Sequence, residues 1–147
     1  MRLGLVLALC TAATTGCVAP ATDTASYEQK AASAATAAVS AARAALIAEQ
    51  TYVTGRMTSA YLEPVLVGAE DALGSVQNSF DSVQPPATSA SDALRSALDP
   101  LLQNASSAAT DLRIAARRDR MADLTSAAHD LRAAADHLDT FAKEHGG

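Results

Sequence analysis

Residues 62–83 read LEPVLVGAEDALGSVQNSFDSV, and this stretch decides the fold. Its apolar residues recur in alternating steps of four and three, at Leu62, Leu66, Ala69, Leu73, Val76, Phe80 and Val83. That spacing places them on one face of an α-helix. Thr58 or Ser59 can cap the helix, and Pro64 falls in its first turns, where a missing amide donor costs least. Because two consecutive prolines cannot continue a helix, we expect it to end before Pro85-Pro86.

Three other segments of the chain repeat the same spacing. The segment before this stretch carries a stripe made of Ala32, Ala35, Val39, Ala42, Leu46, Glu49 and Val53. The segment after it carries Leu94, Leu98, Leu101, Ala105, Ala108, Leu112 and Ala115. The last segment carries Met121, Leu124, Ala128, Leu131, Ala135 and Leu138. Each stripe predicts a helix that buries one face, and alanine, the best helix former, is abundant in all of them.

Turn signals separate these segments. We expect the first helix to begin at Ser26 and to end near residues 52–54, because Gly55 interrupts the pattern there. Thr88 or Ser89 can cap the third helix. The apolar register then breaks in the run of residues 117–120, which indicates a tight turn before the last helix.

The third helix contains a proline well inside its apolar pattern. Pro100 predicts either a kink or a restart of the helix with Asp99 as the new cap.

Four helices of about 25 residues with short joints predict an all-α, up-down-up-down four-helix bundle over residues 26–147. The alternative is a three-helix bundle whose long first helix runs through Gly55.

The start of the chain has the features of an export signal. Arg2 precedes an apolar run from Leu3 to Ala13, which is too short to span a bilayer, since that takes roughly 20 residues. We therefore expect residues 1–16 to be a signal peptide and residues 17–25 to be a tether. An ordinary signal cut after Ala21 is the alternative.

The residues Thr14-Thr15-Gly16-Cys17 follow that apolar run. They resemble the bacterial lipobox, although Thr14 stands where that family usually has leucine. The resemblance implies a lipid thioether on Cys17, cleavage after Gly16, and a protein exported and anchored to the outer face of the cell membrane. With this motif and its abundance of alanine and arginine, the chain is similar to the small Ala-rich lipoproteins of high-GC Gram-positive bacteria.

Composition and charge exclude several classes of function. The chain has 16 acidic and 11 basic side chains, which gives a net charge of −5 and argues against nucleic-acid binding. The spacing of His129, His137 and His145 rotates each about 80° from the last on a helix, so they do not form a metal site. Neighbouring Glu70 and Asp71 diverge by about 100°, and we expect both to lie on a solvated face.

No nucleophile motif or phosphate-binding loop occurs in the sequence, and its ionisable residues form no convergent set, so we expect neither an enzyme nor a cofactor.

One charged feature stands out. Basic residues gather around the first and third turns of the expected bundle, at Arg56, Arg113, Arg117, Arg118 and Arg120. These turns would face away from a lipid anchor at Cys17. They could bind an anionic envelope polymer or an acidic protein, because arginine forks suit carboxylates and phosphates.

Two classes of function therefore stay open. The first is a membrane-tethered, non-catalytic helical module that binds a partner or spaces the envelope. The second is a carrier that holds a small ligand in a cavity between the helices. A filled seam between the helices favours the module, whereas large side chains that border alanine-lined space favour the carrier.

Overall fold

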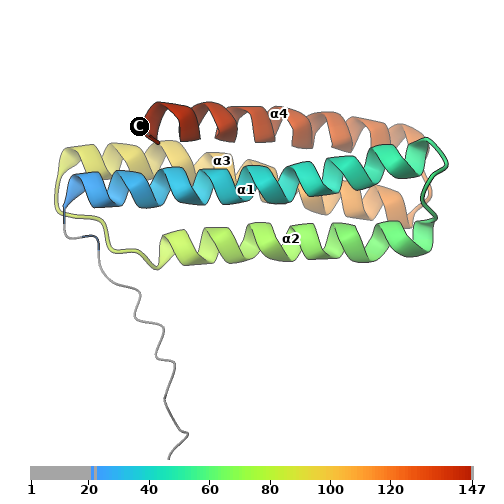
Figure 1. The fold of residues 1–147 in the computed structure, drawn as a ribbon, viewed down its shortest axis with the longest axis horizontal. Coiled ribbons are helices and arrows are strands. Elements are labelled where there is room, and N and C mark those ends of the chain that lie inside the picture. Colours follow the sequence, from blue (N-terminus) through green and yellow to red (C-terminus); the bar gives the residue numbers. More distant parts are fainter. Residues whose placement is uncertain (1–20, 22, 147) are drawn as a thin grey trace, which may run out of the picture.

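The computed structural model describes residues 21 and 23–146, and these contain four α-helices. They are α1 (Thr24–Val53), α2 (Ser59–Asp81), α3 (Ser89–Arg117) and α4 (Met121–His145). α1 and α3 run in one direction and α2 and α4 in the other, as an up-down-up-down bundle requires (Figure 1). The all-α four-helix prediction is confirmed. The three-helix alternative is wrong, because α1 and α2 are separate helices on either side of Gly55.

Side-chain caps set where two of the helices begin. The Asp23 carboxylate accepts a hydrogen bond from the Ser26 backbone N–H at 2.7 Å, so α1 begins at Thr24, two residues before the predicted start at Ser26. Thr88 caps α3 as predicted, with its hydroxyl oxygen 3.2 Å from the Ser91 backbone nitrogen. Each cap satisfies one of the backbone N–H groups that a helix leaves without an internal partner.

Helix α3 continues through Pro100. The predicted restart with Asp99 as a cap is therefore wrong. Pro100 lies on the exposed side of the helix, where water can replace the amide donor that proline lacks. The apolar residues on both sides of Pro100 face one core, so tertiary packing outweighs the local cost of the proline.

The two turns at one end of the bundle close in the same way. After α1, Gly55 has a φ of 72°, and the Arg56 backbone N–H donates to the Thr51 carbonyl at 2.9 Å. After α3, Asp119 takes the glycine's place with a φ of 51°. A residue with positive φ at this position turns the chain away from the helix, and the backbone N–H groups of the turn can then donate to the last carbonyls of the helix. The predicted turns at Gly55, Pro85 and Arg118 are thus confirmed.

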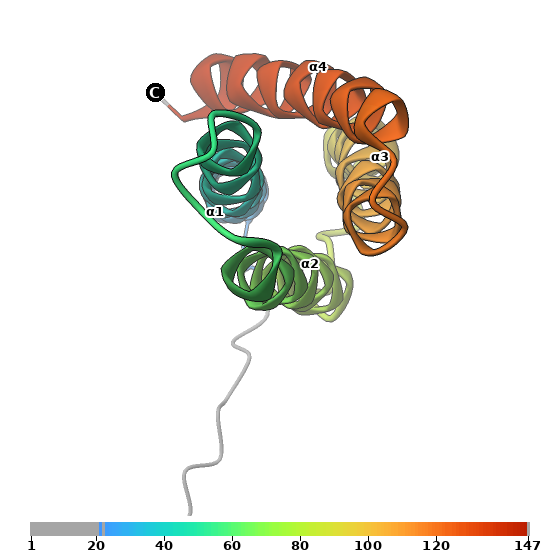
Figure 2. The ribbon, with the colours of Figure 1, turned by 90° about the vertical axis from the view of Figure 1, so that its right-hand side faces the viewer.

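The helices occupy the corners of a four-sided arrangement (Figure 2). α1 and α3 each pack against both α2 and α4, and they also contact each other across the diagonal. α2 and α4 make no such contact in the described part of the chain. The diagonal contact follows from composition, because α1 buries mainly alanine and α3 buries Ala105, Ala108 and Ala109. Side chains this small allow two helices to approach closely.

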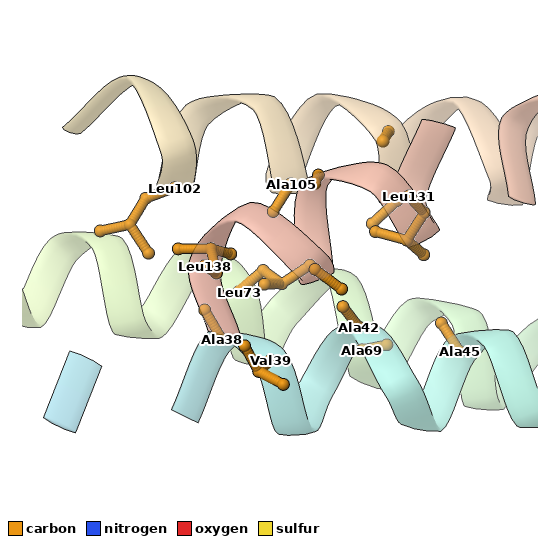
Figure 3. Close-up of a cluster of buried hydrophobic side chains, with 14 of the residues drawn as sticks. Ala38, Val39, Ala42, Ala45, Ala69, Leu73, Leu102, Ala105, Leu131 and Leu138 are labelled. Atoms are coloured by element: carbon orange, nitrogen blue, oxygen red, sulfur yellow. The ribbon is translucent and has the colours of Figure 1, made fainter. Parts of the chain in front are cut away.

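Leucine and alanine side chains fill the centre of the bundle (Figure 3). Most of the predicted stripe residues are buried. Val53 and Met121 are exceptions, with 47% and 44% of their surface exposed, because each lies at the end of a helix where the core has ended. In α3, Leu102 is buried in place of the predicted Leu101, which is only half-buried.

Helix α1 buries a broader face than its stripe predicts. It also buries Ala31, Ala38, Ala45 and Ala48, since it packs against all three other helices. By length and composition it is apolar enough to cross a membrane, with a mean hydropathy of 1.4. This apolar N-terminal helix is compatible with a membrane anchor. Half of the apolar window lies inside the bundle, which a core helix of a water-soluble domain also explains.

Candidate partner-binding site at the distal end of the bundle

The α1–α2 turn and the α3–α4 turn lie at the same end of the bundle, opposite the start of α1 (Figures 1 and 2). We call this end the distal end and the opposite one the proximal end. The distal turns are residues 54–58 and 118–120. All five arginines of the predicted site belong to these turns or to the last turns of α3. The order of the helices therefore brings them to one end of the bundle, as the sequence suggested. Which carboxylates each arginine contacts decides how much of its charge is available to a partner.

Arg113 is held by an acidic side chain of α2. Its guanidinium forms a short ion pair with Glu70 through Nε, and Nη2 lies 3.3 Å from Glu70 Oε1. The Thr110 hydroxyl donates to the same carboxylate at 2.8 Å. The hydrogen bond from Arg113 holds the pKa of Glu70 below its ordinary value. The prediction that Glu70 is solvated is therefore wrong, whereas Asp71 is exposed as expected.

Two more of the arginines also have carboxylate partners. Arg117 Nε lies 3.4 Å from Glu63 Oε1, and Arg120 Nε lies 2.8 Å from Asp123 Oδ2. Both pairs are largely exposed, so each contributes little stability. They nevertheless neutralise much of the charge that the sequence placed at this end.

Arg56 and Arg118 remain as exposed cations. Neither forms an ion pair with any residue that the structure describes. They lie on different turns. The end of α1 is joined to the α3–α4 turn, because the Tyr52 hydroxyl donates to Asp119 Oδ1 at 3.2 Å. An open depression of about 480 Å³ adjoins this contact and is lined in part by Tyr52, Arg117 and Asp119. The distal end thus presents two exposed cations, Arg56 and Arg118, and a depression that is lined by neither of them.

Sequence reasoning missed the polar contacts between α2 and α3. Glu63, Glu70 and Gln77 recur every seven residues on α2 and face Arg117, Arg113 and Gln103 of α3. Polar residues that repeat every seven positions on one of two antiparallel helices are the signal that could have indicated these contacts. It is visible only when both helices are considered together, because a single helix gives no information about its partner's register.

A second polar cluster, at the proximal end, was also missed. Tyr27 is fully buried, and its hydroxyl accepts a hydrogen bond from Arg95 Nε at 3.0 Å. Arg95 Nη2 also donates to the Val83 carbonyl at 2.8 Å, and the guanidinium lies over the Phe80 ring. Arg95 therefore fastens the α2–α3 loop to the start of α1. This is a structural role, because the guanidinium's donors are directed at the protein itself.

The three histidines are dispersed. His129 and His137 are exposed, whereas His145 at the end of α4 packs on Phe141 and forms a 2.8 Å hydrogen bond with Glu28 of α1. Among residues 23–146, no three His, Cys, Asp or Glu side chains come together as metal ligands would.

A buried carboxyl gives a testable pH dependence. Glu49 is only 7% exposed, and burial raises its pKa above the ordinary 4.5, partly offset by Arg132. Above its folded-state pKa the charged form is therefore destabilising. We expect Glu49→Gln to raise Tm at pH 7. The gain should shrink as pH falls through the raised folded-state pKa, which lies above 4.5, and be absent well below pH 4.5, where wild-type Glu49 is neutral in both states. Thermal melts at both pH values, with exposed Glu144→Gln as the control, test this. An equal gain at both would contradict it.

The α1–α2 seam is open to solvent near the proximal end. There a groove of about 560 Å³ is lined by Ser33 and Ala34 of α1 and by Ser75, Ser79 and Phe80 of α2, among others. Its walls combine serine hydroxyls with apolar side chains such as Ala34 and Phe80. The centre of the bundle beneath is occupied by leucine and alanine side chains, which by the criterion set out above favours the module over the carrier.

Cys17, the predicted lipidation residue, lies outside the described residues, as does the predicted signal peptide, residues 1–16. The described chain begins at Ala21, which packs against the core. Comparison of the chain with protein-family models, with curated proteins and with solved structures finds no match.

Proposed function

We propose that the chain is a membrane-tethered, non-catalytic helical module, held at the outer face of the cell membrane by lipid on Cys17. One observation supports this proposal above the others: the N-terminus of the bundle and the arginine-bearing turns lie at opposite ends (Figure 1). Helix α1 has 30 residues, which corresponds to about 45 Å at 1.5 Å per residue. A tether at residue 17 would therefore leave the distal end well clear of the membrane.

The anchor itself is tested by replacing Cys17 with alanine. The wild-type protein should be found in the membrane fraction, because two acyl chains hold a protein there firmly. The variant should lose the lipid and move to the soluble fraction, while circular dichroism shows the same helix content. Retention of a processed, unlipidated variant in the membrane fraction would contradict the anchor.

The partner proposed for the distal end is an anionic envelope polymer or an acidic protein. Support comes from Arg56 and Arg118, whose guanidinium groups are not occupied by carboxylates of the described chain. Arg113 is not among the proposed contacts, because Glu70 already pairs with its guanidinium. Binding through exposed cations should weaken as salt rises.

Replacing both Arg56 and Arg118 with glutamine is expected to reduce retention by isolated envelope, or by immobilised polyphosphate, several-fold at low salt. The matched control is Gln29→Glu with Gln84→Glu, which changes the net charge equally but at exposed positions near the proximal end. The control should bind nearly as well as the wild type. Equal losses in the two variants would mean that only net charge matters, and the distal end would then have no specific role.

A further inference from the structure

One face of the bundle carries no charged side chain along two rows of residues, and Lys30 borders these rows at the proximal end, where it lines the groove between α1 and α2. On α1 the outward residues follow steps of four and three, and they are Ser33, Ala37, Ser40, Ala44, Ile47 and Thr51. On α2 a flank with the same spacing consists of Tyr61, Val65, Gly68, Ala72, Ser75 and Ser79. These two rows adjoin, because Ser33 lines the same groove as Ser75 and Ser79. We call them together the α1–α2 face.

The hydroxyl groups on the α1 part of this face are already hydrogen-bonded. Ser33 donates to the Gln29 carbonyl at 2.8 Å, Ser40 to the Thr36 carbonyl at 3.0 Å, and Thr51 to the Ile47 carbonyl at 2.6 Å. A hydroxyl that donates back to its own helix does not need a partner from outside. Removing this surface from water therefore costs less than its polar composition suggests.

Large apolar side chains are exposed on the same face. Tyr61 is 71% exposed, Ile47 is 65% exposed and Val65 is 37% exposed. Tyrosine is enriched where one protein surface packs on another. An uncharged face with exposed large apolar side chains indicates an interaction site.

We infer that the α1–α2 face binds a second copy of this chain. Each copy has a net charge of −5, so two copies repel unless they meet where neither presents a charge, and this face is such a place. The lack of charge also gives the face nothing with which to select a charged partner. The small side chains of the rows from Ser33 to Ala44 and from Gly68 to Ser79 allow helices of the two copies to approach to about 8–10 Å there.

The size of the face suits a dimer of modest affinity. The row from Ser33 to Thr51 and the row from Tyr61 to Ser79 each extend about 27 Å at 1.5 Å per residue. Two adjacent helices give a footprint on the order of 500 Å² per copy, or about 1,000 Å² for the pair. That total reaches the lower limit for a specific interface.

The test is sedimentation equilibrium of the full chain with Cys10→Ser and Cys17→Ser, so that neither a disulfide nor a lipid contributes. Val65→Asp and Val67→Asp form a matched pair: both valines are on α2 and are 37% and 38% exposed. Val67 is on the side of α2 that also carries Glu63 and Glu70, which contact α3, whereas Val65 is on the α1–α2 face. We expect Val65→Asp to raise the dimer dissociation constant more than tenfold and Val67→Asp to leave it within about threefold.

Salt and cross-linking complete the test. Because like charges oppose the dimer, added salt should tighten it, whereas it should weaken binding at the distal arginines. A single cysteine at Ala44 should cross-link between copies, and one at exposed Asp111 of α3 should not. A monomer at all concentrations, or equal effects of the two aspartates, would overturn the inference. So would a monomer that binds neutral phosphatidylcholine vesicles and loses that binding on Val65→Asp, because the face would then belong to a membrane.

Discussion

Leu102→Ala is expected to cost about 3 kcal/mol of unfolding free energy, which is the typical loss for a leucine removed from a packed core. Leu102 is 1% exposed and its side chain points into the centre of the bundle (Figure 3). The cavity that the change would leave cannot collapse easily, because the core cluster that contains Leu102 is built from side chains of all four helices.

The control for this prediction is the neighbouring residue. Leu101→Ala removes the same atoms from a half-buried site, and we expect it to cost less than about 1.5 kcal/mol. Urea unfolding of both variants measures the difference. The comparison is sharp because the apolar spacing of the sequence favours Leu101 as the core residue and the structure favours Leu102. A larger loss at Leu101 would show that α3 is rotated from the orientation described.

Arg95→Ala is expected to have the second largest effect, a loss of about 2–3 kcal/mol. The change would leave the buried Tyr27 hydroxyl without its donor and free the Val83 carbonyl in the α2–α3 loop. Tyr27→Phe alone should cost only about 1 kcal/mol, because it removes the hydroxyl together with its need for a partner.

The two substitutions together should cost less than the sum of the single losses. Once the hydroxyl is absent, the loss of Arg95 no longer leaves it unpaired, and urea unfolding of all four proteins gives the coupling energy. Arg43→Ala is the control, since Arg43 pairs with Asp139 at the surface and is 56% exposed. We expect its loss to be below 1 kcal/mol. Additive effects of the Arg95 and Tyr27 changes would mean that their hydrogen bond is not what stabilises the loop.

The fold could be predicted from the sequence because its signals are local. Apolar residues at steps of three and four, the double proline, Gly55 and the cap at Thr88 each act within a few residues, and together they define four helices. The rotation of α1 was harder to predict. Alanine occupies 12 of the 30 positions of that helix and occurs on its exposed face as well as its buried one, so burial of Ala31 and Ala38 leaves no contrast in the sequence.

The position of the candidate site could be predicted from the sequence, but the charge that it presents could not. Chain topology alone brings the five arginines to the distal end, and topology follows from the number of helices and the short turns. Their partners depend on the relative register of two helices. Arg113 meets Glu70 across 43 positions of sequence, and Arg95 meets Tyr27 across 68. Only the packed core fixes which residues meet at such separations.

The hydrogen bond between His145 and Glu28 places the end of α4 beside the start of α1. Because the first and last residues of the bundle are neighbours, the helices could be connected in another order without a change in how they pack. A circular permutant that joins residue 146 to residue 23 through a short linker, and that opens the chain between Arg118 and Arg120, would retain all four helices. Its new N-terminus, with any lipid signal placed before it, would lie among the arginines. The same bundle would then stand on the membrane in the opposite polarity, with its arginines against the lipid and its proximal end outward.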